Sequence, residues 1–309
     1  MSQLNPAALI AGHGTRSQAG VAEFSRLIER IQARLAAENI DAAGGFIELA
    51  PPPLAQSVAG LIERGHHRLI VVPLVLVAAG HAKGDIPAAM ERERLRHEGL
   101  TYAYGRPLGP HPTLQTLLAR RVDEALAGDP REGTAVLVVG RGSSDPDANA
   151  EIVKVARLLW EGREFDLTET SFVSLAWPSV PEGLERLRRL GANRIVVAQY
   201  FLFPGVLPDR IVEQSAEFAA AHPELDVRVA GVLGDSDELA ALVIDRYHEA
   251  LLGDIRMNCD TCMYRAAMPG FQQRVGAPQR PHHHPDDPSA AHDHLDHEHP
   301  ADAPSDHVH

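Results

Sequence analysis

The chain has 309 residues, two cysteines and a formal net charge of −13. Its length predicts two domains or one domain with two lobes, and two cysteines exclude a scaffold held together by disulfides. The acidic charge argues against a nucleic-acid partner, which would need a face of Lys and Arg, and the apolar runs are too short for a membrane span of about 18 residues.

Short runs rich in Val and Ile alternate along the chain with longer segments of helical period. The predicted strands are, in chain order, Ala7–Gly12, Gly44–Leu49, Leu69–Val77, Leu100–Tyr104, Ala135–Gly140, Thr170–Leu175, Arg194–Phe203 and Val227–Val232. Between the first two, apolar residues from Val21 to Leu35 recur at spacings of three and four, which predicts one buried face of a helix. Each half therefore predicts an α/β unit, a parallel sheet flanked by helices on both faces.

The two halves carry the same motifs in the same order, which indicates an internal duplication. Corresponding positions are His13 and Arg141, Glu48 and Ser174, and His81 and Val206. Since the first copy alone keeps the polar set, we expect an N-terminal lobe with a metal site at residues 1–130 and a degenerate C-terminal lobe at 131–253. A Cys-x-x-Cys segment follows at 254–275, and a disordered tail rich in His and Asp follows at 276–309.

Three loops of the first half carry side chains suited to a divalent metal. His13 follows the first predicted strand, Glu48 closes the second, and His81 follows the third. Ligands bind beyond the carboxyl ends of parallel strands, so we expect the three to meet at one edge of the sheet. A single His in such a loop is more often a capping residue, and Glu48 alone could be an ordinary carboxylate. Their convergence favours a site for Co, Ni, Zn or Fe(II).

Three segments resemble the class II tetrapyrrole chelatases. They are Gly12-His13-Gly14-Thr15-Arg16, Gly45-Phe46-Ile47-Glu48-Leu49 and Ala78–Pro87. The resemblance covers about residues 7–250 and implies a two-lobed chelatase-like fold with one active lobe. It also implies a lyase that inserts Co²⁺ into sirohydrochlorin in cobalamin biosynthesis, with Fe²⁺ or Ni²⁺ as alternative metals.

The same resemblance implies roles for single residues. His13 would bind the incoming cobalt and accept pyrrole protons, His81 would be the second metal ligand, and Glu48 would contact the macrocycle and could share the role of base. The residues that would line the tetrapyrrole are Leu76, Val77, Ala78, Ala79, Gly80 and His81.

Four cations at predicted loop edges could bind the carboxylates of sirohydrochlorin. They are Arg16, Lys83, Arg141 and Arg210, and the planar guanidinium of Arg suits a carboxylate better than the ammonium of Lys. Each of them alone is as easily a solvated surface charge. Arg141 is the most informative of the four, because it would be a substrate anchor kept by a lobe that lost its metal.

Cys259 and Cys262 are separated by two residues, a spacing that suits zinc, a redox disulfide or a metal cluster. The resemblance to the longer chelatases favours a [4Fe–4S] cluster. Such a cluster ordinarily takes four thiolates, so it would need a homodimer or ligands other than cysteine. The tail from His282 to His309 holds nine of the 17 histidines and could bind Co²⁺ or Ni²⁺ loosely.

The expected partners are sirohydrochlorin and a divalent metal, without nucleic acid or membrane. No secretory signal opens the sequence, so we expect a cytoplasmic protein. A non-catalytic metal chaperone would also explain the His-rich tail, but it would not need the apolar run Leu74–Ala79. A periplasmic-type binding protein would share the two α/β lobes, and the missing signal and the unequal halves argue against it.

Overall fold

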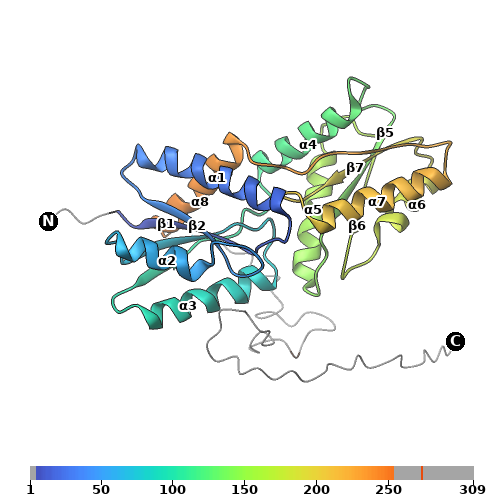
Figure 1. Cartoon of the computed structure of the whole chain (residues 1–309). Helices are drawn as coiled ribbons and strands as arrows, with labels where there is room; N and C mark the ends of the chain where they lie inside the picture. Colours follow the sequence, from blue (N-terminus) through green and yellow to red (C-terminus); the bar gives the residue numbers. More distant parts are fainter. Residues whose placement is uncertain (1–4, 254–272, 274–309) are drawn as a thin grey trace.

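The computed structural model describes residues 5–253 and residue 273, and these form two α/β lobes side by side (Figure 1). In this part of the chain each lobe holds a four-stranded sheet, with strand order β2-β1-β3-β4 in the first and β6-β5-β7-β8 in the second. Neighbouring strands are parallel throughout both sheets. The predicted fold class, two similar lobes with parallel sheets between helices, is therefore confirmed.

The strands are β1 (Ala7–Gly12), β2 (Ala42–Phe46), β3 (Arg68–Pro73), β4 (Thr101–Tyr104), β5 (Thr134–Gly140), β6 (Leu167–Phe172), β7 (Arg194–Gln199) and β8 (Asp226–Val229). The helices are α1 (Gln18–Ala36), α2 (Leu54–Glu63), α3 (Ile86–Arg96), α4 (Pro112–Leu126), α5 (Pro146–Trp160), α6 (Val180–Arg189), α7 (Val206–Ala221) and α8 (Asp237–Leu251). A five-residue π-helical turn, η1 (His81–Asp85), leads into α3. None of the helices in the described residues is long and apolar enough to cross a membrane.

Helix α1 illustrates how the sequence forms these elements. Ser17 caps its first turn by accepting a hydrogen bond from the Gly20 amide, which satisfies a donor that has no partner within the helix. Its apolar stripe is buried from Phe24 to Leu35, as the spacing predicted. The stripe covers one face of the first sheet, so local propensity and tertiary packing favour the same conformation.

Five predicted strands extend too far at their C-terminal ends: the second, sixth and eighth by three residues each, and the third and seventh by four. The third strand ends at Pro73, four residues before Val77, and the seventh ends at Gln199 instead of Phe203. The apolar residues beyond these ends leave the sheet and line a cavity instead. The apolar runs therefore predicted correctly that these residues avoid water, but they predicted strands that are too long. The reason is that a buried strand and the wall of an apolar cavity are built from the same residue types.

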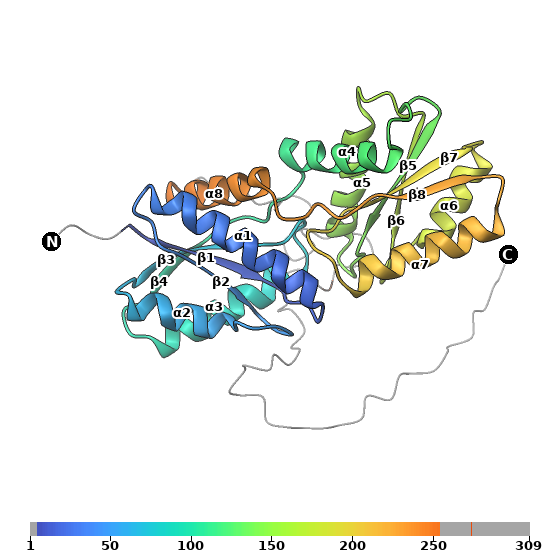
Figure 2. The same cartoon turned by 45° about the horizontal axis from the view of Figure 1, so that its top comes forward.

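The last helix of each half packs on the sheet of the other half. Helix α8 contacts α1, β3 and β4, whereas α4 contacts β7, β8 and α5, and both views show α8 beside α1 (Figures 1 and 2). The boundary expected near residue 130 follows α4 in the chain, but α4 itself belongs by packing to the second sheet. One apolar core consequently runs through both lobes.

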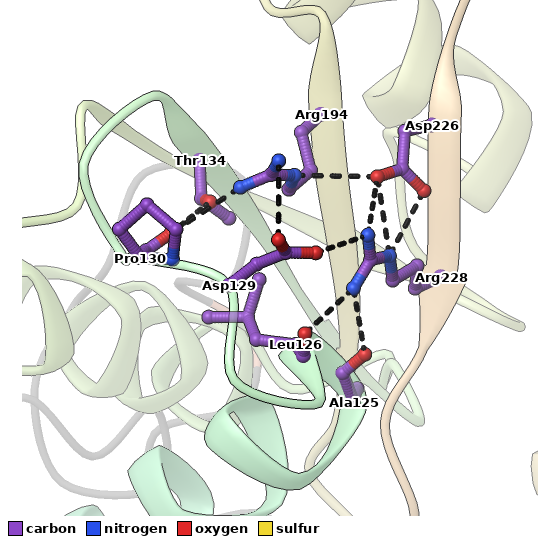
Figure 3. A network of polar contacts seen from close by, with 8 residues as sticks. All are labelled: Ala125, Leu126, Asp129, Pro130, Thr134, Arg194, Asp226 and Arg228. Carbon is purple, nitrogen blue, oxygen red and sulfur yellow. Dashed lines mark hydrogen bonds and ion pairs between the residues drawn. The ribbon is translucent and has the colours of Figure 1, made fainter.

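A network of polar contacts fixes the end of α4 to the second sheet (Figure 3). Arg228 of β8 donates hydrogen bonds to the main-chain oxygens of Ala125 and Leu126 and to the carboxylate of Asp129. Arg194 of β7 reaches the same Asp129 at 3.9 Å. These contacts hold the connection between the lobes against the edge of the sheet that α4 covers.

Candidate functional site

A cavity of about 720 Å³ lies between the two lobes, beyond the carboxyl ends of their central strands. The first lobe contributes the loops after β1 and β3 to its wall, and the second lobe contributes the loops after β5 and β7. Most of the wall is apolar, and His13, His81 and Arg141 are among its polar residues. In parallel α/β proteins, ligands usually bind at this position, beyond the carboxyl ends of the strands.

His13 is presented to the cavity by a tight contact between two loops. Gly14 has φ +116°, and a Cβ atom there would lie 1.8 Å from the main-chain oxygen of Glu48, so a side chain cannot be accommodated. The Glu48 amide donates to the His13 oxygen at 3.1 Å. These contacts bring the side chains together, with His13 Nε2 3.0 Å from Glu48 Oε1.

His81 begins the turn η1 and meets His13 across the loops. Their ring centroids are 3.9 Å apart with an angle of 71° between the ring planes. His81 Nδ1 lies 2.5 Å from Oδ2 of Asp85, whose side chain is 4% exposed. The structure thus brings together the two imidazoles and the carboxylate that the sequence assigned to this edge, and it adds a second carboxylate.

Burial lowers the pKa of His13 to about 4. The nearby His81 and Arg141 add to this shift, whereas the contacts with Gly14 and Glu48 partly oppose it. His13 is therefore neutral at physiological pH. A neutral imidazole can bind a cation or accept a proton, which an imidazolium cannot do.

The other predicted site residues divide into two groups. Arg16, Leu76, Val77, Ala79, Gly80 and Arg141 line the cavity together with the two histidines. Glu48, Ala78 and Arg210 are not lining residues, although Glu48 reaches the site through His13.

Lys83 departs from its expected role as a group for binding a substrate carboxylate. Its ammonium is 2.7 Å from the carboxylate of Asp145 and 3.1 Å from that of Asp147, and all three side chains are buried. Burial alone would lower the pKa of Lys83, but the hydrogen bonds to Asp145 and Asp147 raise it above its usual value. The cation links the lobes and does not line the cavity.

The second lobe reproduces the backbone of the first site with other side chains. Gly142 has φ +86°, and a Cβ atom there would lie 1.8 Å from the main-chain oxygen of Ser174. The Ser174 amide donates to the oxygen of Arg141 at 3.0 Å, as Glu48 does to His13. Arg141 therefore occupies the position in its lobe that His13 occupies in the first. Burial lowers its pKa, but a guanidinium remains charged at neutral pH.

Two imidazoles leave most coordination positions of an ion open. Within residues 5–253 and 273, no three His, Cys, Asp or Glu side chains are grouped so that they could hold a metal ion. Catalytic metal sites leave coordination positions open for other ligands. A site with two imidazole ligands would therefore suit an ion that is transferred to another molecule. Cys259, Cys262 and the tail from His282 lie outside the described residues.

Sequence reasoning missed Asp85 and the apolar wall that the second lobe provides between Tyr200 and Pro208. The signal for Asp85 was present, because a side chain four residues after His81 on a helical segment lies on the same face. The first part of this wall, Tyr200 to Phe203, was assigned to the end of the seventh strand.

Comparisons with known proteins agree with the two-lobed fold. The model of the CbiX family matches residues 7–125 and 135–250. A sirohydrochlorin cobaltochelatase of Priestia megaterium is 37% identical over 261 residues, covering 83% of this chain and 84% of that protein. A sirohydrochlorin ferrochelatase of the same organism is 32% identical, covering 77% and 87%. The structure of SirB from Bacillus subtilis with Fe³⁺ superposes with a TM-score of 0.72 at 26% identity, covering 81% of this chain and 97% of that one.

Proposed function

The chain belongs to the CbiX family, and we propose from this membership that it inserts a divalent metal ion, Co²⁺ in the first place, into sirohydrochlorin. The meeting of His13 and His81 at a cavity between two lobes is the observation that carries the proposal. Such a protein would be a lyase of cobalamin biosynthesis that works in the cytoplasm. The apolar cavity favours this function over a metal chaperone, which needs no space for a macrocycle.

The choice of Co²⁺ rests on the higher identity to a cobaltochelatase than to a ferrochelatase. The residues themselves are less selective. Two imidazoles and a carboxylate can bind Co²⁺, Fe²⁺ and Ni²⁺, and the affinity of such a site generally increases from Fe²⁺ to Co²⁺ to Ni²⁺. Metal choice is therefore the part of the proposal that a direct measurement must decide.

Insertion requires the ion to lose its water and the macrocycle to lose two pyrrole protons. His81 and the neutral His13 would hold the ion, because the low pKa of His13 keeps protons from competing for its nitrogen. As the ion enters the ring, the two pyrrole protons would pass one at a time to His13 and then to Glu48, whose carboxylate is 3.0 Å away and, being partly exposed, would release the first proton to solvent before it takes up the second. His13 thus acts first as a ligand and then as a base, never as both at once.

Arg141 would hold the substrate from the opposite wall. It lines the cavity, and its guanidinium suits the carboxylates that surround a sirohydrochlorin ring. Arg16 lines the cavity too and would bind a second carboxylate.

The test is an anaerobic absorbance titration of sirohydrochlorin with Co²⁺, Fe²⁺ and Ni²⁺ in turn, using the full chain and four variants. We expect His13→Ala and His81→Ala to slow insertion about 100-fold or more, since each removes a ligand. Arg141→Ala is expected to raise the KM for sirohydrochlorin about tenfold and to leave Co²⁺ affinity unchanged. His67→Ala, on an exposed loop, is the matched control and should behave as the wild type.

Wild-type insertion of Co²⁺ faster than that of Fe²⁺ and Ni²⁺ supports the cobalt assignment, and the reverse order replaces it with one of the other metals. Full activity of both histidine variants would refute the site. The predicted [4Fe–4S] cluster or other thiolate site at Cys259 and Cys262 stays a prediction, as does the homodimer it would need.

A further inference from the structure

The turn that carries His81 ends in a buried acid, Asp85. This residue stands at the start of α3, where an Asp would ordinarily accept a hydrogen bond from a helix amide, but its side chain makes no capping bond there. Its carboxylate instead lies 2.5 Å from Nδ1 of His81, four residues earlier. Asp85 is also one of the residues at the cavity wall.

The contact decides which nitrogen of His81 carries the proton. A carboxylate accepts hydrogen bonds, so Nδ1 must be the donor and must bear the N–H. In a neutral imidazole the lone pair then resides on Nε2. Carboxylates that bind a ligating His in this way fix its ring and make the other nitrogen a stronger metal ligand.

The turn around this pair is fixed on two further sides. The hydroxyl of Tyr104 donates to the main-chain oxygen of Ala82 at 2.8 Å, and the ammonium of Lys83 binds the acids of the opposite lobe. A π-helical turn is an uncommon conformation that is frequently found at functional sites. These contacts fix the turn that carries both Asp85 and His81.

His13 has no comparable arrangement. Both of its ring nitrogens face acceptors, with Nδ1 3.2 Å from the Gly14 oxygen and Nε2 3.0 Å from Glu48. A neutral imidazole has one N–H and can donate to one of these acceptors at a time. The surroundings of His13 therefore permit either tautomer, whereas those of His81 select one.

We propose that Asp85 is a positioning residue that holds His81 as the firm metal ligand of the site, with the lone pair on Nε2, and that His13 is the exchangeable ligand. The inference rests on the proposed function, because it requires that His81 binds the ion. The two imidazoles then have different roles, since His81 keeps the ion in place while His13 releases it and takes up protons.

The first experiment needs no variant beyond the one used for assignment. Long-range ¹H–¹⁵N NMR of the metal-free wild type, with the His81 signals assigned by comparison with His81→Ala, reports which ring nitrogen bears the proton. We expect the Nδ1–H tautomer for His81. Finding the Nε2–H tautomer would overturn the proposal, whatever the enzyme does with its substrates.

The second experiment measures the affinity for Co²⁺ alone, without tetrapyrrole, by calorimetry. Asp85→Asn should lower the affinity about 10- to 100-fold and leave the Kd for sirohydrochlorin within about twofold of the wild type. Glu93→Gln is the matched control, because Glu93 is a buried acid of the same helix that also pairs with a His four residues away, at 3.5 Å from Nε2 of His97. It should leave Co²⁺ affinity unchanged.

The outcomes separate this inference from the proposed function. If His81→Ala abolishes Co²⁺ binding while Asp85→Asn does not weaken it, the positioning role is wrong and the metal site stands. If His81→Ala binds Co²⁺ as the wild type does, His81 is not a ligand and both proposals fail. A loss of Co²⁺ affinity that is equal in Asp85→Asn and Glu93→Gln would show a general effect on folding and would also refute the positioning role.

Discussion

The charge state of His13 follows from its burial and from the charged groups around it. Its ring is neutral at pH 7 because burial, His81 and Arg141 together lower its pKa to about 4. In the unfolded chain the same ring would titrate near the ordinary value of 6.5. At a pH between about 4 and 6.5, His13 is therefore protonated in the unfolded chain and neutral in the folded one. The free energy of unfolding must depend on pH in this range.

The sign of this dependence can be tested on the metal-free protein. Between pH 6.5 and 4 the unfolded chain binds the proton that the folded chain refuses, so acidification favours unfolding. From pH 7 to pH 5 we expect His13 to account for a loss of about 2 kcal/mol in the free energy of unfolding. Urea denaturation across this range should show a shallower pH dependence for His13→Asn than for the wild type. His67→Asn, on the exposed loop, should retain the wild-type dependence.

An equal pH dependence in His13→Asn and the wild type would mean that His13 has the same pKa in the folded and the unfolded chain. The statement that the fold lowers the pKa of His13 and keeps its ring neutral well below pH 6.5 would then be wrong. The measurement thus checks a premise of the mechanism without requiring any substrate.

At the scale of elements, the strand that leads to each site residue was predictable and its end was harder to locate. The bounds of β1 agree with the sequence prediction because Gly12 and Gly14 bracket a clear change from apolar to polar residues. The end of β3 was missed because Leu74 to Ala79 continue the apolar pattern while the chain turns away toward the cavity. An apolar residue type indicates that a side chain avoids water. It does not indicate whether the side chain lies within a sheet or in the wall of a ligand cavity.

The packing of α4 and α8 on each other's lobe was not predictable for a related reason. Periodicity identifies the apolar face of a helix, but it carries no information on which sheet covers that face. The π turn η1 escaped prediction as well, since one inserted residue leaves no periodic signal in so short a segment. The sequence nevertheless placed both histidines at the correct sheet edge, because strand ends and topology alone determine that position.

The turns that follow β2 and β6 contain a shared backbone feature. Leu49 and Leu175 have φ values of 66° and 60°, a left-handed conformation that costs a residue with a Cβ roughly 1–2 kcal/mol. Both side chains line the cavity, and they are 47% and 70% exposed. A strained and exposed leucine in each lobe is consistent with an apolar contact for a flat substrate.

Replacing Leu175 with Gly should separate folding from substrate binding. We expect a midpoint of thermal unfolding that is unchanged or higher, because relief of up to about 1–2 kcal/mol of strain offsets the greater freedom of Gly in the unfolded chain. The Kd for sirohydrochlorin should rise several-fold through loss of the apolar contact. Leu190→Gly is the control: Leu190 is also exposed but has φ −78°, so this change should lower stability and leave binding unaffected. If Leu175→Gly unfolds at a lower temperature than the wild type and binds sirohydrochlorin with the wild-type Kd, both the predicted relief of strain and the predicted apolar contact are wrong.

At the scale of the whole molecule, two kinds of contact join the lobes. The exchanged helices α4 and α8 form one apolar core on one side. Next to the cavity, Lys83 of the first lobe binds Asp145 and Asp147 of the second, and its side chain is 6% exposed against 3% for each acid. Lys83 lies in the turn that begins with His81. The ion cluster therefore links the relative orientation of the two lobes to the position of His81, a predicted metal ligand.

Removal of one partner from a buried ion cluster is costly because the remaining charges lose their compensation. Lys83→Met should therefore lower the free energy of unfolding by about 3–5 kcal/mol. The triple variant Lys83→Met, Asp145→Asn, Asp147→Asn should recover much of this loss, since it leaves no unpaired charge. Lys154→Met, at an exposed position of α5, should have little effect on stability.

Co²⁺ affinity distinguishes a link between the lobes from a local contribution to stability. If the cluster holds η1 in place, the triple variant should be stable and still bind Co²⁺ less tightly than the wild type, because His81 has lost its tether to the opposite lobe. Wild-type Co²⁺ affinity in a stable triple variant would show that the cluster stabilises the fold without positioning the ligand. In that case the contacts within the turn, from Tyr104 and Asp85, would suffice to hold His81.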